Sequence, residues 1–90
     1  MLLGMQDKKN NAIDARTFAE IWQSLGTSSY EQLDLRDALI TRLRVTRQTV
    51  NYWGNGRVAP AYEEVKKAIA EVVNKSLGIR TTSRTLFPSR

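Results

Sequence analysis

The chain of 90 residues contains neither cysteine nor histidine. The absence of cysteine excludes disulfide scaffolds, thiolate zinc sites and thiol catalysis, and it suits a reducing cytoplasm. The absence of histidine excludes Ser-His and Cys-His nucleophile pairs and the usual zinc sites. General acid–base chemistry would depend on nine carboxylates and a few Lys and Tyr side chains. We therefore expect a protein that is not an enzyme and requires no cofactor or metal.

Long apolar runs are absent as well. Met1–Met5 holds a few apolar residues before Asp7, Lys8 and Lys9, and this is too short for the core of a signal peptide, which has roughly 7–15 apolar residues. No segment approaches the roughly 20 apolar residues that a membrane-spanning helix needs. We therefore expect a cytoplasmic protein with no membrane partner.

Basic residues are what the chain has in excess. It holds 14 Lys and Arg against nine Asp and Glu, which gives a formal net charge of +5. Its 41% of apolar and 26% of charged residues, with five Gly and two Pro, are typical of one folded globular domain. The positive charge favours a polyanionic partner, either nucleic acid or an anionic lipid surface.

Apolar residues in the first half of the chain predict two amphipathic helices. We place the first between Asp14, a candidate N-cap, and Gly26, which favours a helix end. Ser28 and Glu31 have the spacing of a capping box and predict the start of the second helix, which is either continuous or divided at Arg36. The two apolar stripes consist of Phe18, Ile21, Trp22 and Leu25, and of Leu35, Leu39, Ile40 and Leu43.

The second half predicts two more helices and a polar end. A short helix over about residues 47–53 has Thr46 as its N-cap and stops at the turn-forming residues 54–56. A further helix runs from about Ala61 to Gly78. We therefore expect an all-α fold of four or five helices. Its parts are a flexible N-terminal arm (1–12), a helical domain (13–78) and a flexible basic C-terminal tail (79–90).

The segment from Leu39 to Pro60 carries the main functional signal. Its features are Leu43 and Val45 around a turn, Thr46 as cap, Val50 and Trp53 as inward residues, then Asn55, Gly56 and Pro60. They resemble the helix-turn-helix of the phage-repressor and Cro-like (XRE-type) family of bacterial DNA-binding domains. The resemblance implies a compact lambda-repressor-like domain acting as a prokaryotic or phage transcriptional regulator. The chain departs from that family at two positions, since Ile40 stands where the family usually carries a small residue and Arg44 where it usually carries Gly. A left-handed Arg44 would cost about 1 kcal/mol relative to Gly.

The outward face of the short helix over residues 47–53 suits contact with bases. Val50 and Trp53, at i and i+3, turn inward and leave an outward face without any acidic residue. Gln and Asn can make bidentate bonds to adenine, and Arg can do so to guanine. The expected base-reading residues are Gln48, Arg47, Asn51 and Tyr52. The expected phosphate-binding residues are Thr46, Thr49, Asn55, Gly56, Arg57, Arg42 and Arg44.

Charge gathers around the same helix. Between Arg36 and Arg57 there are five arginines and one acidic residue, Asp37. Most of the net positive charge of the chain therefore lies next to the expected turn. Double-stranded DNA is accordingly the expected partner, and nothing in the sequence indicates a small-molecule substrate.

The state of assembly and two rival functions stay open. The second half holds many apolar residues for a chain end, which favours a homodimer with a seam near the last helix. The residues concerned are Val72, Val73, Leu77, Ile79, Leu86 and Phe87. One rival function is a protein-interaction module, antitoxin-like or an adaptor, whose basic face meets an acidic partner. The other is RNA binding, for which the chain lacks strands with paired aromatic residues.

Overall fold

Five α-helices and no strand form the regular structure of residues 13–27 and 29–88, the part of the chain that the computed structural model describes. The all-α expectation is therefore confirmed. The arm expected over residues 1–12 lies outside the described residues. The helices are α2 (Phe18–Ser24), α3 (Tyr30–Leu43), α4 (Arg47–Gly54), α5 (Glu63–Leu77) and α6 (Ser83–Leu86).

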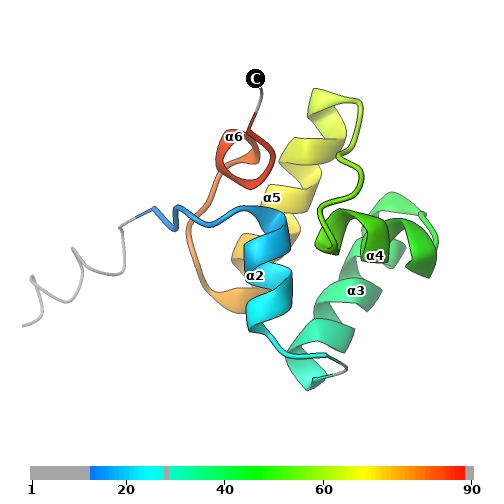
Figure 1. Cartoon of the computed structure of the whole chain (residues 1–90). Helices are drawn as coiled ribbons and strands as arrows, with labels where there is room; N and C mark the ends of the chain where they lie inside the picture. Colours follow the sequence, from blue (N-terminus) through cyan, green and yellow to red (C-terminus); the bar gives the residue numbers. More distant parts are fainter. Residues whose placement is uncertain (1–12, 28, 89–90) are drawn as a thin grey trace, which may run out of the picture.

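The two longest helices, α3 and α5, pack along one another and form the base on which the others lie (Figure 1). α4 crosses the end of α3 and also packs against α2, while α6 covers α5 and the start of α2. Apolar side chains from all five helices meet in one core. Its buried members are Phe18, Ile21, Trp22, Leu35, Leu39, Val50, Trp53, Ile69, Ala70, Val72, Val73, Leu86 and Phe87.

α2 starts later than the expected cap at Asp14, and that expectation is wrong. Thr17 is the N-cap: its hydroxyl accepts from the amide of Glu20 at 3.2 Å, and the Glu20 carboxylate accepts from the amide of Thr17 at 2.8 Å. This reciprocal pair satisfies two amides that the helix itself leaves free. Asp14 is engaged elsewhere, since Arg16 donates to its carboxylate at 2.7 Å. The expected end at Gly26 is confirmed by its φ of +89°.

The starts of α3 and α5 also differ from expectation. Ser29 caps α3 by accepting from the amide of Gln32, so the expected pairing with Glu31 is wrong, and the expected cap Ser28 lies outside the described residues. α3 is continuous through Arg36, and no break occurs there. α5 begins at Glu63, after the expected start, and it has no side-chain cap.

The ion pair at the start of the domain predicts a specific acid response. Hydrogen bonds from the Arg16 side chain lower the pKa of the Asp14 carboxyl below its ordinary value. Because the folded-state pKa is depressed, this pair stabilises the domain above the unfolded-state pKa, about 3.9, and the contribution is lost as pH falls through the folded value. We expect an NMR titration to give a low Asp14 pKa that rises in Arg16→Ala. An unchanged pKa in that variant would contradict the assignment.

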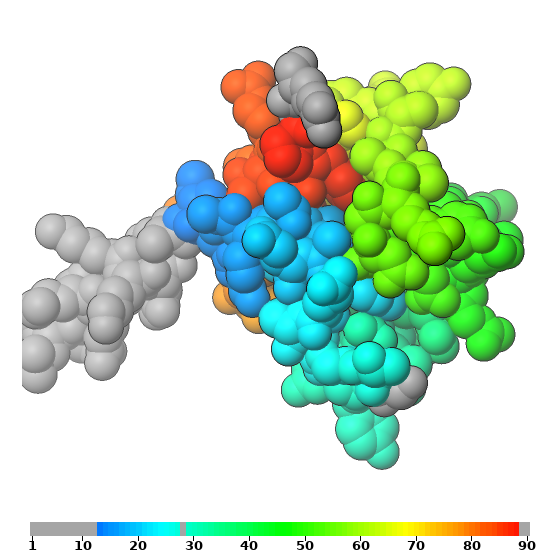
Figure 2. All heavy atoms as spheres, in the orientation of Figure 1, coloured from blue at the N-terminus to red at the C-terminus, as the bar shows by residue number. Residues whose placement is uncertain are grey.

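The chain after α5 is part of the core, so the expected loose tail is wrong for residues 79–88. Thr81 is buried, and Asn74 on α5 accepts from its amide at 2.8 Å and donates to its carbonyl oxygen at 3.1 Å. The ring of Phe87 stacks on Phe18 with centroids 5.6 Å apart. Figure 2 shows these C-terminal residues, in orange and red, packed against the start of α2. The helical domain therefore extends beyond the expected boundary at residue 78.

The same packing corrects the expected position of a dimer seam. Val72, Val73, Leu86 and Phe87 are buried within the single chain, and Leu77 and Ile79 are half-buried against the same core. Their apolar surface is thus used inside the domain and is not available to a second copy. A homodimer, if it forms, has to use another face.

Candidate nucleic-acid interface

A tight turn joins α3 to α4 and sets the direction of α4. α3 ends at Leu43, and Arg44 follows in the left-handed conformation with φ 56° and ψ 42°. The amide of Arg44 donates to the carbonyl oxygen of Ile40 at 2.8 Å, which closes the helix end. Val45 is half-buried against the core. Arg44 thus adopts the left-handed conformation for which the family usually has Gly.

Thr46 begins α4 as predicted. Its hydroxyl accepts from the amide of Thr49 at 3.2 Å and lies 2.9 Å from the Thr49 hydroxyl. The two expected phosphate-binding hydroxyls are therefore bonded to one another, and each keeps further hydrogen-bonding capacity. The first amides of α4 have no acceptor within the helix and lie at the positive end of its dipole. The helix dipole therefore favours a negative charge at this end, where Arg47 is the first residue of the helix.

The inward side of α4 packs closely on α2. Val50 and Trp53 are buried, as predicted, and so is Gly54. The indole of Trp22 lies so close to Gly54 that a Cβ added there would overlap the ring. Because the contact is between a ring and bare backbone, the rotation of α4 about its own axis is fixed. The opposite face of α4 is therefore held toward solvent.

The outward face of α4 is polar, exposed and free of acidic residues. The four residues predicted to read bases are all exposed, and so is Asn55 just after the helix. Gln48 and Tyr52, one turn apart, are hydrogen-bonded: the Gln48 Nε2 donates to the Tyr52 hydroxyl at 2.7 Å. The structure thus brings together on one face the base-reading candidates Arg47, Gln48, Asn51 and Tyr52.

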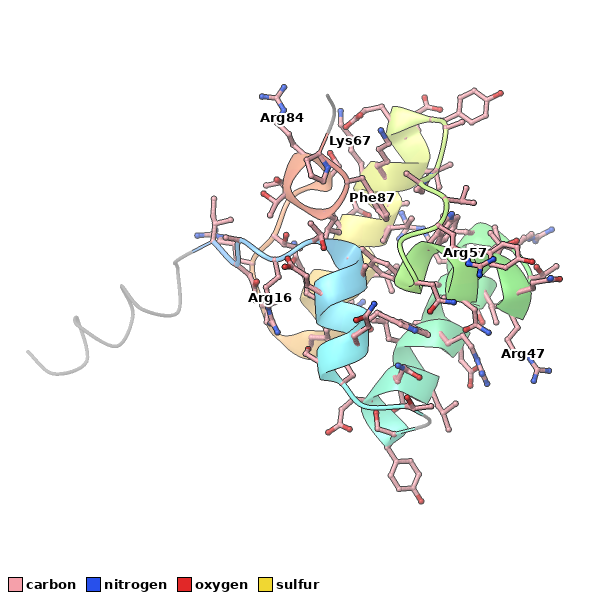
Figure 3. The ribbon with its side chains drawn as sticks, in the orientation of Figure 1. Arg16, Arg47, Arg57, Lys67, Arg84 and Phe87 are labelled. Carbon is pink, nitrogen blue, oxygen red and sulfur yellow. The ribbon has the colours of Figure 1, made fainter. Side chains whose placement is uncertain are left out.

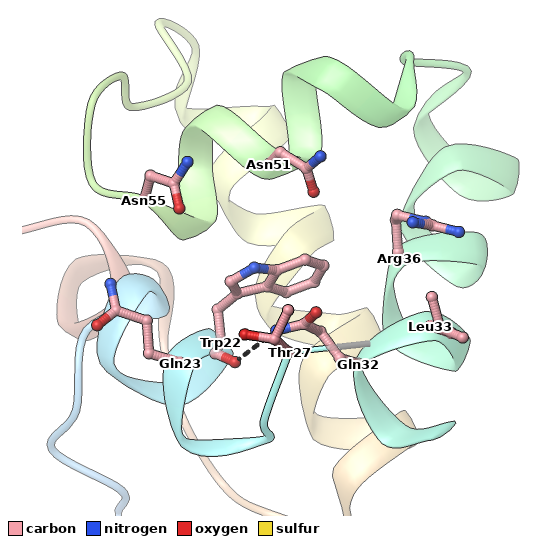
Figure 4. A pocket seen from close by; sticks show the side chains of 8 residues that line it. All are labelled: Trp22, Gln23, Thr27, Gln32, Leu33, Arg36, Asn51 and Asn55. Atoms are coloured by element: carbon pink, nitrogen blue, oxygen red, sulfur yellow. Dashed lines mark hydrogen bonds between the residues drawn. The ribbon is translucent and has the colours of Figure 1, made fainter. Parts of the chain in front are cut away.

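A polar cleft of about 530 Å³ runs along one side of this face, between α4 and the α2–α3 region (Figure 4). Asn51 and Asn55 point into it from above, and the indole of Trp22 lies beneath them. Its polar lining consists of four carboxamides, one hydroxyl and one guanidinium, and it includes no carboxylate. Its lining residues are Trp22, Gln23, Thr27, Gln32, Leu33, Arg36, Asn51 and Asn55.

Six of the eight lining residues were not among the predicted site residues, and they include the polar side chains of Gln23, Gln32 and Arg36. The side-chain amides of Gln23 and Gln32 donate to the carbonyl oxygens of Gly54 and Trp22, which ties the walls of the cleft together. The Nε of Arg36 is buried and has no hydrogen-bond partner in the part of the chain that the structure describes. The i, i+4 spacing of Gln32 and Arg36 predicts that the two side chains lie on the same face of their helix. It does not predict which other helix that face meets.

The predicted phosphate-binding arginines divide into two groups. Arg44, Arg47 and Arg57 are exposed and form no ion pair with any described carboxylate. Figure 3 shows Arg47 and Arg57 on the α4 side of the molecule, away from Arg16 and Arg84. Arg42, by contrast, binds Glu71 of α5 at 2.9 Å. The structure does not bring Arg42 to the α4 face.

The turn after α4 offers side chains but few backbone donors. Gly56 has a φ of +74°, as its place in a turn requires. The amides of Asn55, Gly56 and Arg57 donate to carbonyl oxygens at the end of α4. Gly56 therefore has no free donor for a phosphate, contrary to its predicted role. Binding there depends on the side chains of Asn55 and Arg57.

Comparisons with protein-family models, curated proteins and solved structures found no match. Within residues 13–27 and 29–88, no helix is long and apolar enough to cross a bilayer, and no group of Asp, Glu, His or Cys residues could hold a metal ion. Function must therefore be inferred from α4 and its surroundings.

Proposed function

We propose that this chain binds double-stranded DNA through α4, with sequence preference, and acts as a small transcriptional regulator of the helix-turn-helix class. The observation that carries the proposal is the outward face of α4. It is exposed, free of acidic residues and rich in carboxamides, and the packing of Gly54 on Trp22 fixes its direction.

The dimensions and chemistry of α4 suit the major groove. A helix with its side chains is about 10–12 Å across, and the groove of B-DNA is about 12 Å wide. Gln48 and Asn51 present donor and acceptor atoms of the kind that match adenine, and Arg47 presents the fork that matches guanine. With α4 in the major groove, the base edges contact the middle of its outward face. The two phosphate backbones contact the residues on either side of that face.

The residues on either side of the outward face of α4 supply cations and polar groups for the DNA phosphate backbone. Arg44 lies before α4 and Arg57 after it, while Arg36 lines the cleft beside it. The cleft has no carboxylate to repel a phosphate. Arg36 is not counted as a free cation, because its Nε lies 3.9 Å from the Asp37 carboxylate. With Arg47 as the third free cation, neutralisation of one phosphate by each of the three arginines gives a log–log salt slope of about −2.7 per protomer.

The direct test is selection of bound duplexes from a random pool. We expect enrichment of one short motif, and, for a homodimer, two copies related by a two-fold axis. The spacing of the copies would report the assembly. Equal affinity for heparin and for every duplex would contradict the proposal and favour a module whose basic face meets an acidic protein partner.

Loss of Arg57 should weaken all duplexes alike. In Arg57→Ala the magnitude of the log–log salt slope should fall by about 0.9, because one phosphate contact is lost, while the selected motif stays the same. The matched control is Arg42→Ala, whose guanidinium binds Glu71. Fluorescence anisotropy at several salt concentrations measures both slopes. A slope that changes equally in the two variants would show that Arg57 has no special place at the interface.

A further inference from the structure

One side-chain pair on the outward face of α4 is already hydrogen-bonded in the unbound protein. The Nε2 of Gln48 donates to the hydroxyl of Tyr52 at 2.7 Å. Both residues are exposed, and 39% of Tyr52 is accessible to solvent. An exposed glutamine usually samples many rotamers, and holding one of them costs conformational entropy. Here the tyrosine one turn along the helix holds the amide in place.

The bond leaves a defined set of atoms on Gln48. A glutamine amide has two N–H donors and one carbonyl oxygen. When the N–H given to Tyr52 is the one anti to Oε1, the other N–H and Oε1 stay free and lie side by side on the planar amide. Adenine presents one acceptor, N7, and one donor, the N6 amino group, side by side in the major groove. The free edge of Gln48 matches this pair.

The same edge discriminates against guanine. Guanine presents two acceptors, N7 and O6, in the major groove. The free N–H of Gln48 can serve one of them, but Oε1 would then face the other acceptor. The Nε2 cannot turn to offer both of its hydrogens while one is bonded to Tyr52. Holding the amide therefore removes the orientation in which glutamine would tolerate guanine.

We propose that Tyr52 is a positioning residue for base recognition: its hydroxyl fixes the Gln48 amide so that the free edge of this amide reads one adenine. The inference rests on the proposed function, since it assigns a base to a residue of the same face. Fixing one rotamer-rich side chain before binding corresponds to a gain of about 2- to 10-fold in binding. Without the tyrosine hydroxyl, this gain and part of the preference for adenine are lost.

The test uses Tyr52→Phe, which keeps the ring and removes only the hydroxyl. Selection with wild type and Gln48→Ala first identifies the base pair whose preference depends on Gln48. Dissociation constants are then measured for all four bases at that position. We expect wild type to prefer adenine, and we expect Tyr52→Phe to lose about 2- to 10-fold of that preference while its preferences at other positions persist. Tyr62→Phe is the matched control, because Tyr62 is 72% exposed and lies outside α4.

NMR provides a second readout in the free protein. The side-chain amide protons of Gln48 should shift in Tyr52→Phe and stay in place in Tyr62→Phe, because only the first change removes the acceptor. Unshifted amide protons in Tyr52→Phe would overturn the proposal without any DNA. This readout does not depend on whether the variant still binds its target.

The outcomes separate this inference from the proposed function. If wild type selects no motif, the proposed function fails and the inference falls with it. If wild type selects a motif but Tyr52→Phe keeps its full preference at the Gln48 position, Tyr52 does not position the amide and the proposed function stands. A base other than adenine at that position would overturn the base assignment. An equal loss of affinity for all four bases would mean that Tyr52 contacts the DNA backbone.

Discussion

Replacing Gly54 with alanine should destabilise the domain by about 2–4 kcal/mol, although alanine is the better helix former. In an open helical position the same change stabilises by about 1 kcal/mol. Gly54 is the last residue of α4, and it is buried against the indole of Trp22. The added methyl group would occupy space already held by the ring, so the sign of the effect reverses.

The clash between the added methyl group and the indole of Trp22 is costly to relieve, because neither the indole nor α4 can move freely. Trp22 is 5% exposed and belongs to the core, where its ring stacks on Phe18 with centroids 5.8 Å apart. Moving the indole breaks that packing, and moving α4 breaks the packing of Val50 and Trp53. Interiors packed to crystal density have no slack for a methyl group. Either way the direction of α4 changes, so duplex binding should be lost as well.

Urea unfolding of Gly54→Ala, Trp22→Ala and the double variant measures this contact. Because Trp22→Ala makes room for the methyl group, we expect Gly54→Ala to cost little in that background, which gives a coupling energy of about 2–3 kcal/mol. Gly78→Ala is the matched control. Gly78 has a φ of 66° and open space around its Cα, so only conformational strain of about 1 kcal/mol is expected. A Gly54→Ala protein more stable than wild type would rule out the α2–α4 contact.

The parts of the fold that the sequence predicted correctly are those fixed by contacts within one or two turns. Thr46 caps α4 through an amide three residues away, and Arg44 closes the end of α3 onto Ile40. Such signals need no knowledge of the rest of the molecule. The start of α2 was misplaced at Asp14, although its actual cap is also a local feature. Thr17 with Glu20 has the capping-box spacing, whereas Asp14 was already bonded to Arg16.

The C-terminal segment was mispredicted because its order comes from tertiary contacts alone. It has no apolar periodicity, and α6 is too short to be stable by itself. Leu86 and Phe87 are ordered because α2 and α5 leave an apolar surface for them to cover. No property of the local sequence distinguishes such a segment from a loose tail with two exposed apolar residues.

In the candidate site, too, the features fixed by local spacing were predicted and those fixed by tertiary packing were not. The exposure of Gln48 and Asn51 follows from the inward turn of Val50 and Trp53, and it was predicted from spacing. The cleft beside them requires the relative placement of three helices, which no single-helix pattern contains. The ion pair of Arg42 was missed for the same reason, because the sequence does not show that Glu71 of α5 lies beside it.

Replacing Phe87 with alanine should cost about 3–4 kcal/mol of unfolding free energy. The ring is 8% exposed and stacks on Phe18, which is itself fully buried. Removal of the Phe87 ring would leave a cavity next to Phe18. The melting temperature should fall by roughly 4–8 °C for each kcal/mol lost. Arg84→Ala is the control, since Arg84 is an exposed residue of α6, the helix that ends just before Phe87.

Phe87→Ala also separates stability from binding. Phe87 packs on the start of α2, and none of the arginines proposed to bind phosphate lies in its segment. In a domain of ordinary stability, about 5–15 kcal/mol, most molecules of the variant stay folded at 25 °C. The salt slope of DNA binding should therefore match that of wild type, and apparent affinity should fall only with the folded fraction. If Phe87→Ala melts like Arg84→Ala, the chain end contributes nothing to the core. A flattened salt slope would instead mean that the chain end contacts phosphate, because loss of folded protein lowers affinity equally at every salt concentration.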